Sequence, residues 1–162
     1  MDEIDALILS TLLDDGREAW SRIGDRVGLT GPAVAERVKR LEERRVIRGY
    51  AALLNPEAVG FPLLAFVAVT LETGHHRRAF LARVAALPEI QECHHVTGED
   101  DYLLKVRCRG PADLDRFLTE QLKGGPGVIR TRTQIVLRSE KESVGLPPLG
   151  EPGEMGRAER RA

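Results

Sequence analysis

The sequence predicts an α+β fold made of two domains, an N-terminal winged helix-turn-helix and a C-terminal ferredoxin-like βαββαβ domain. Two observations support this prediction. Over the first third of the 162 residues, apolar side chains recur at helical spacing in three successive segments. From residue 61 onward, apolar runs of strand length alternate with helical segments. We therefore expect the helix-turn-helix domain at residues 1–54, a linker at 55–60, the ferredoxin-like domain at 61–142 and a disordered tail at 143–162.

Three helices are predicted in the first domain, over residues 2–15, over residues 20–27 and from residue 30 onward. Asp2 and Thr30 are suitable N-caps of the first and third helices, and Pro32 is tolerated in the first turn of the third. After Arg45 the periodicity changes, and residues 46–54 predict a short strand or hairpin, which would be the wing.

The second and third helices have the spacing that a helix-turn-helix needs. Gly28 ends the second helix, and Gly24 lies where a close approach of the two helices favours a very small side chain. The apolar positions expected between the helices are Ile23, Val27, Leu29, Val34 and Val38. With these positions buried, we expect the opposite face of the third helix to carry Ala33, Glu36, Arg37 and Arg40.

The formal net charge of −1 hides a local imbalance, because residues 37–48 contain six arginines or lysines and only two glutamates. A basic helix face can be an ordinary solvated surface, but after the Gly24/Gly28 frame it favours a helix that lies in the major groove of DNA. The DNA-binding candidates are Thr30, Pro32, Ala33, Glu36, Arg37, Lys39, Arg40 and Arg45. We expect Glu36 to pair with Arg40, four residues on, rather than to accept a hydrogen bond from cytosine.

In the second domain, strands are predicted at residues 61–71, 90–96, 102–108 and 128–138, with helices at 74–87 and from Pro111 to about Leu122. The strand at 61–71 is apolar on both faces. A split βαβ domain covers one face of its sheet with its own helices, so the other face would leave apolar surface in water. A second copy of the chain would cover it, and a two-fold dimer would also present two recognition helices to DNA. We therefore expect a homodimer.

The chain is expected to be cytoplasmic and reduced, with no membrane partner, no cofactor and no metal. Its acidic start lacks the regions of a signal peptide, and no apolar run approaches the roughly 20 residues that span a bilayer. Cys93 and Cys108 make neither a disulfide framework nor a CxxC pair. On a strand, Cys93 and His95 share one face while His94 takes the other, so this triplet cannot chelate a metal as a unit. A metal site assembled between subunits is the alternative.

The two domains carry motifs in a fixed order at residues 5–9 (DALIL), 15–17 (DGR), 26–30 (RVGLT), 37–42 (RVKRLE), 46–50 (VIRGY), 96–106 (VTGEDDYLLKV) and 131–133 (TRT). Together, over about residues 2–140, they resemble the Lrp/AsnC, or feast/famine, family of transcription regulators. The resemblance implies a DNA-binding domain, a ligand-sensing domain, and dimers that assemble into tetramers, octamers or open helices. Two positions depart from the family pattern: Arg45 stands where the family usually has Gly, and Glu36 where relatives often have a basic or neutral residue.

The turn at residues 98–101 (GEDD) is the second candidate site. A carboxylate in such a turn can pair with the ammonium group of an amino acid, and backbone amides can hold a carboxylate. The resemblance implies an amino-acid effector near this turn, between dimers, with Gly98 and Asp101 as contacts. Further ligand-binding candidates are His95, Thr133, Gln134 and Val136. A polar hairpin turn that binds no ligand is the alternative.

The leading hypothesis is therefore a sequence-specific DNA-binding transcription regulator whose assembly or DNA affinity responds to a small molecule, an amino acid in the first instance. An effector-independent architectural DNA-binding protein would use the same helix and the same assembly. An enzyme on a dimeric ferredoxin-like fold is the third class. The sequence shows no nucleophile–base pair, and residues 124–127 (GGPG) lack the Lys-Ser/Thr of a phosphate-binding loop, so we assign no catalytic residue.

Overall fold

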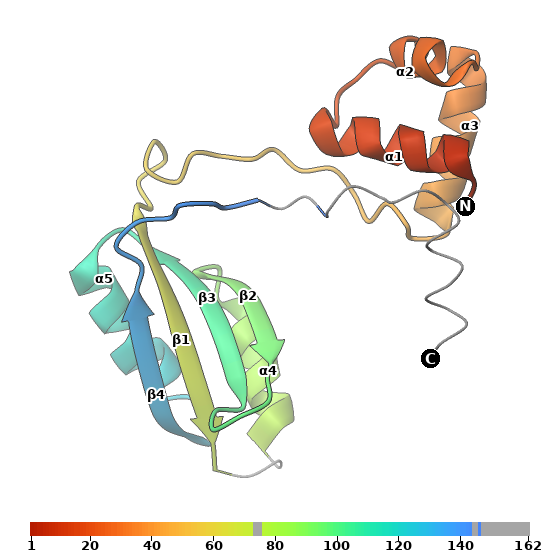
Figure 1. Ribbon diagram of the computed structural model, residues 1–162. Helices are drawn as coiled ribbons and strands as arrows, with labels where there is room; N and C mark the ends of the chain where they lie inside the picture. Colours follow the sequence, from red (N-terminus) through yellow and green to blue (C-terminus); the bar gives the residue numbers. More distant parts are fainter. Residues whose placement is uncertain (73–75, 144–145, 147–162) are drawn as a thin grey trace. The chain divides into compact units, whose positions relative to one another are not determined.

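The computed structural model of the protein describes residues 1–72, 76–143 and 146 (Figure 1). They divide into two compact units, Met1–Ala52 with the described residues from Glu142 onward, and Leu53–Lys141. The tail predicted at residues 143–162 falls, apart from residues 143 and 146, outside the described residues. In the described part of the chain, no helix has the length and hydropathy of a membrane span.

The first unit consists of three helices, α1 (Glu3–Asp14), α2 (Trp20–Val27) and α3 (Gly31–Glu43). As predicted, Asp2 caps α1 and Thr30 caps α3. The α1 cap is reciprocal, because the Asp5 amide donates to the Asp2 carboxylate at 2.8 Å and the Asp2 amide donates to the Asp5 carboxylate at 3.1 Å. The helices pack on a small apolar core formed by Ile8, Ile23, Val34 and Val38.

The turn between α2 and α3 depends on two glycines, as the sequence predicted. Gly28 has a φ of 72°, in the left-handed region that favours glycine, and its amide donates to the Gly24 carbonyl. Gly24 is buried, and a Cβ built on it would lie 2.3 Å from the Leu29 carbonyl oxygen. The backbone after α2 therefore approaches α2 more closely than any side chain at position 24 allows.

The strand or hairpin predicted at residues 46–54 is not formed; those residues contain no strand. Instead α3 ends in a left-handed cap, in which Arg45 has a φ of 57°. The Arg45 amide donates to the Glu42 carbonyl and the Val46 amide to the Leu41 carbonyl, each at 2.8 Å. These bonds tie the backbone directly after the helix to the helix end, and the described residues of this unit offer no neighbouring strand for the residues that follow.

The second unit is a four-stranded antiparallel sheet with helices on one face (Figure 1). Its elements are β1 (Leu63–Leu71), α4 (Arg77–Ala86), β2 (Ile90–His95), β3 (Tyr102–Cys108), α5 (Pro111–Arg116), the π-helical turn η2 (Phe117–Leu122) and β4 (Val128–Ile135). The strand order is β2-β3-β1-β4. This order confirms the predicted βαββαβ arrangement. The start of the helix predicted at 74–87 lies partly on residues 73–75, outside the described residues.

The two faces of the sheet have different roles. One face is covered by the helices: Val67, Val69 and Leu104 are fully buried there against Phe80 and Phe117. The second face carries the alternate residues of each strand and is covered by none of the helices α4, α5 and η2 that the structure describes in this unit. We call it the open face. At one of its edges lies the connection between β2 and β3, residues 96–101, which contains the predicted turn.

Candidate functional site

Most of the predicted DNA-binding residues are exposed on α3 or next to it: Thr30, Pro32, Glu36, Lys39, Arg40 and Arg45. Ala33 is half-buried in the first turn, where its amide donates to Thr30 Oγ1 at 3.4 Å. Pro32 has no amide hydrogen to leave unpaired at this position. The N-terminal turn of α3 therefore presents small, largely apolar groups, which suits contact with thymine methyl groups.

Ion pairs neutralise part of the charge on the exposed face of α3. Arg40 Nε lies 3.3 Å from Glu36 Oε1, which confirms the expected pairing, and Lys39 lies 3.9 Å from Glu43. The unpaired cations lie at the end of the helix, at Arg44, Arg45 and Arg48, whose side chains take part in none of the ion pairs among the described residues. Arg44 was not among the predicted DNA-binding residues, although the basic run 37–48 contained it.

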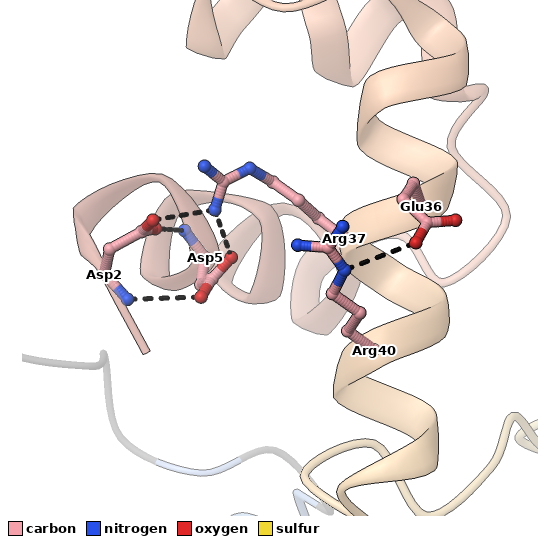
Figure 2. A network of polar contacts seen from close by, with 5 residues as sticks. All are labelled: Asp2, Asp5, Glu36, Arg37 and Arg40. Atoms are coloured by element: carbon pink, nitrogen blue, oxygen red, sulfur yellow. Dashed lines mark hydrogen bonds and ion pairs between the residues drawn. The ribbon is translucent and has the colours of Figure 1, made fainter.

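Arg37 is placed differently from the sequence expectation. Its side chain extends to the N-terminal end of α1, where Nη1 lies 2.7 Å from Asp2 Oδ2 and 2.8 Å from Asp5 Oδ1 (Figure 2). The side chain is 29 % exposed. Arg37 therefore joins α3 to α1, whereas its neighbours Glu36 and Arg40 pair with each other.

The Asp2–Asp5–Arg37 cluster is held by charge-assisted hydrogen bonds. The Asp5 amide and the Arg37 guanidinium both donate to the Asp2 carboxylate and lower its pKa. The hydrogen bonds from Arg37 to the carboxylates of Asp2 and Asp5 in turn raise the pKa of Arg37. Beside the cluster lies a small cavity of about 220 Å³ whose lining also includes Arg40 and Arg44. The cluster thus holds the middle of α3 against the N-terminal end of α1.

A second site lies on the open face of the sheet, where a cavity of about 420 Å³ opens beside the β2–β3 connection. Its lining residues are Ala68, Val96, Thr97, Gly98, Glu99, Asp100, Leu103, Arg132 and Gln134. Ala68 on β1 lies between Leu103 of β3 and Arg132 of β4 in the sheet register, so three adjacent strands form the floor. Gly98, with a φ of 119°, allows the connection to fold over the edge of this floor.

The charged wall of this cavity centres on Asp100. Its side chain is only 7 % exposed and accepts hydrogen bonds from Thr70 Oγ1 at 3.0 Å and from Arg132 at 2.6 Å. Arg130 lies farther away, with Nη2 at 3.4 Å from Asp100 Oδ1. Glu99 is exposed at the rim, and its carboxylate lies 3.9 Å from Arg132. A buried carboxylate therefore anchors two arginines that stand two residues apart on β4.

Two of the six predicted ligand-binding residues, Gly98 and Gln134, line this cavity. Asp101 has a structural contact instead: its carboxylate accepts a hydrogen bond from the Leu71 amide at 2.7 Å. Thr133 is paired with Val67 and therefore faces the helices. The other two predicted residues, His95 and Val136, are absent from the lining.

The His95 ring is tilted against the Tyr102 ring, with 5.2 Å between their centroids, and the Val136 amide donates to the Leu64 carbonyl. Asp100 and Arg132 were missed. Residues 99–101 offer three consecutive carboxylates, and the sequence does not show which of them turns inward. The alternation of Arg130, Arg132 and Gln134 on a predicted strand was the available signal. Within the described residues, no group of three or more His, Cys, Asp or Glu side chains is placed to hold a metal ion.

Comparison with known proteins agrees with this architecture. A family model described as the AsnC-type helix-turn-helix domain matches residues 1–42, and one described as the Lrp/AsnC ligand binding domain matches residues 64–146. The chain is 43 % identical over 145 residues to the leucine-responsive regulatory protein of Escherichia coli K12, covering 88 % of each chain. The leucine-responsive regulatory protein of Haemophilus influenzae is also 43 % identical over 145 residues, covering 88 % of this chain and 87 % of that protein.

Solved structures give the same result for the fold. A transcriptional regulator of Neisseria meningitidis in complex with L-Met has a TM-score of 0.87 at 34 % identity, covering 91 % of this chain and 96 % of that one. A feast or famine regulatory protein of M. tuberculosis complexed with L-methionine has a TM-score of 0.81 at 38 % identity, covering 87 % and 95 %. The chain belongs to the Lrp/AsnC family and is a DNA-binding transcription regulator.

Proposed function

We propose that this regulator binds a free amino acid with an apolar side chain in the open-face cavity and that binding changes its assembly or its affinity for DNA. The cavity itself is the observation that carries the proposal. Its floor is apolar at Ala68 and Leu103, whereas its wall is charged at Asp100 and Arg132. An amino acid has the same division between an apolar side chain and a charged head. Two of the similar structures hold L-methionine, and the similar curated proteins are named for leucine.

DNA binding is assigned to α3, whose exposed face would enter the major groove. The base and phosphate contacts come from Thr30, Pro32, Ala33, Lys39, Arg40 and Arg45, while Glu36 pairs with Arg40. Arg44 and Arg48 add unpaired positive charge for the backbone. Arg37 acts on DNA binding indirectly, because its guanidinium is bound by Asp2 and Asp5 and holds α3 against α1.

Assembly is assigned to the open face of the sheet. Phe66, which lies outside the cavity, points out of this face and is only half-buried, with no helix among the described residues of the unit over it. A second copy packed on this face removes apolar area from water, so we expect a homodimer and, from the family resemblance, higher assembly to tetramers or octamers. The effector can shift such an assembly only by as much as its affinities for the two states differ.

The test measures DNA binding and amino-acid binding on the same protein. DNA fragments selected by the wild-type chain from a random pool are titrated by fluorescence anisotropy, with and without each of the twenty amino acids, while thermal shift reports binding. The affinity for DNA should fall steeply with salt, and at least one apolar amino acid should change it. Ala68→Leu fills the floor of the cavity and should abolish this response, whereas Ala82→Leu, on the exposed side of α4, should keep it.

Two results would contradict the proposal. If the wild type binds DNA equally in the presence of every amino acid and shows no thermal shift, the chain is an effector-independent architectural protein. If Ala68→Leu responds like Ala82→Leu, the effector binds elsewhere. Salt-independent DNA binding would count against the phosphate contacts assigned to α3.

A further inference from the structure

The guanidinium of Arg132 is oriented by the protein and yet remains open to solvent. One nitrogen, Nη2, lies 2.6 Å from Asp100 Oδ2, and Arg132 is nevertheless 60 % exposed at the cavity wall. Its anchor does not move freely, because the Asp100 side chain is 7 % exposed and also accepts a hydrogen bond from Thr70. An arginine has five N–H donors in a planar arrangement, so a guanidinium bound at one edge still offers donors to a ligand.

We propose that Arg132 binds the α-carboxylate of the amino-acid effector and that Asp100 is a positioning residue that holds the guanidinium toward the cavity. This inference rests on the proposed function, which assigns the cavity to an amino acid. It adds the residue that recognises the charged head of the ligand, and it replaces the earlier expectation that backbone amides of the turn bind the carboxylate.

The charges around the cavity fit a zwitterion. Arg132 is the positive group of the cavity wall, and Asp100 forms the ion pair that orients it. The donors of the guanidinium that Asp100 does not use favour the carboxylate of a ligand. Glu99 stands at the exposed rim, 3.9 Å from Arg132, where its carboxylate is available to an ammonium group.

The apolar floor sets the direction in which the ligand lies. In the register of the sheet, Ala68 is the neighbour of both Leu103 and Arg132, so an amino acid whose carboxylate meets Arg132 places its side chain over Ala68 and Leu103. Ala68 is the smallest of these side chains and leaves room for an unbranched or γ-branched aliphatic group. Leucine and methionine are therefore the probes for the test.

The test compares the binding of each of these two amino acids with the binding of its amide, by isothermal titration calorimetry on the full chain. L-Methioninamide and L-leucinamide keep the ammonium group and the side chain but lose the negative charge. The wild type should bind each acid roughly 10- to 100-fold more tightly than its amide, which is the range for one lost charge-assisted contact. Arg132→Met should bind acid and amide with similar, weak affinities. Arg132→Lys, which keeps the charge but not the planar arrangement of donors, should recover part of the preference.

Asp100→Asn separates a positioning role from a merely structural one. It should lower the affinity for the acid and leave the affinity for the amide nearly unchanged, whereas a general loss of structure would lower both. Arg130→Met is the matched control, because Arg130 stands on the same strand and contacts the same Asp100 at a longer distance but does not line the cavity. It should keep the preference of the wild type for the acid.

The outcomes distinguish the two proposals. If the wild type binds the acids and the amides equally, or if Arg132→Met keeps the preference for the acids, the carboxylate is held elsewhere and this inference is wrong, while the proposed function stands. If the wild type binds neither leucine nor methionine, this inference is wrong, and the proposed function falls with it only if no other amino acid gives a thermal shift. If Arg132→Met fails to fold, Arg132→Lys decides, because an unchanged preference in that variant would also overturn the assignment.

Discussion

Replacing Gly24 by Ala should destabilise the helix-turn-helix unit, although alanine is the better helix former. Helix propensity alone would stabilise α2 by about 1 kcal/mol. The new Cβ, however, would lie 2.3 Å from the Leu29 carbonyl oxygen and 3.3 Å from its carbonyl carbon. Both obstacles are backbone atoms, so no side-chain rotation relieves the contact.

The size of the effect follows from these opposing contributions. Overpacking of this kind costs typically about 1–3 kcal/mol and sometimes more, and a contact this short belongs at the upper end. Moving the turn away would also strain the hydrogen bond from the Leu29 amide to the Gly24 carbonyl, now 3.0 Å long. We expect a net loss of about 2 kcal/mol, which would lower the midpoint of thermal unfolding of so small a unit by roughly 8–16 °C.

Trp20 gives a direct assay. It is the single tryptophan of the chain and the first residue of α2, so its fluorescence follows the unfolding of this unit in urea. Gly16→Ala is the matched control, because a Cβ at Gly16 would meet its nearest neighbour, the Leu12 carbonyl oxygen, at an ordinary 3.7 Å. If Gly24→Ala is as stable as the wild type, or as stable as Gly16→Ala, the argument from a close backbone approach is wrong.

Two further changes test the C-terminal end of α3 and the contact of α3 with α1. Arg45→Gly removes a non-glycine residue from a φ of 57° and should stabilise the unit by about 0.5–1 kcal/mol in the same urea assay; a loss of stability would show that the side chain itself is needed. The lowered pKa of Asp2 means that its carboxylate stabilises the fold above about pH 3.8 and that this contribution disappears as the pH falls further. Asp2→Asn should therefore flatten the acid limb of the stability profile measured with Trp20, and an unchanged limb would refute a role for the contact with Arg37.

The sequence predicted the elements well wherever apolar residues repeated regularly along a segment or a capping residue marked its end. Trp20–Val27 and Tyr102–Cys108 have the bounds that were predicted, and the N-caps Asp2 and Thr30 are confirmed. The strand or hairpin predicted at residues 46–54 was wrong because a strand needs a partner strand, and the pattern of one segment does not show whether a partner exists.

The helix-turn-helix frame and the order of strands and helices followed from the sequence alone. They depend on local quantities, namely the spacing of apolar residues, the small size of Gly24 and the left-handed conformation of Gly28, which neighbours along the chain determine. Only the tertiary structure decided what the charged side chains do. Arg37 contacts Asp2, 35 residues away, and Arg132 contacts Asp100, 32 residues away. A long charged side chain has several possible partners of opposite charge in the sequence. The burial, strand register and distances of the folded chain decide which of these partners it contacts.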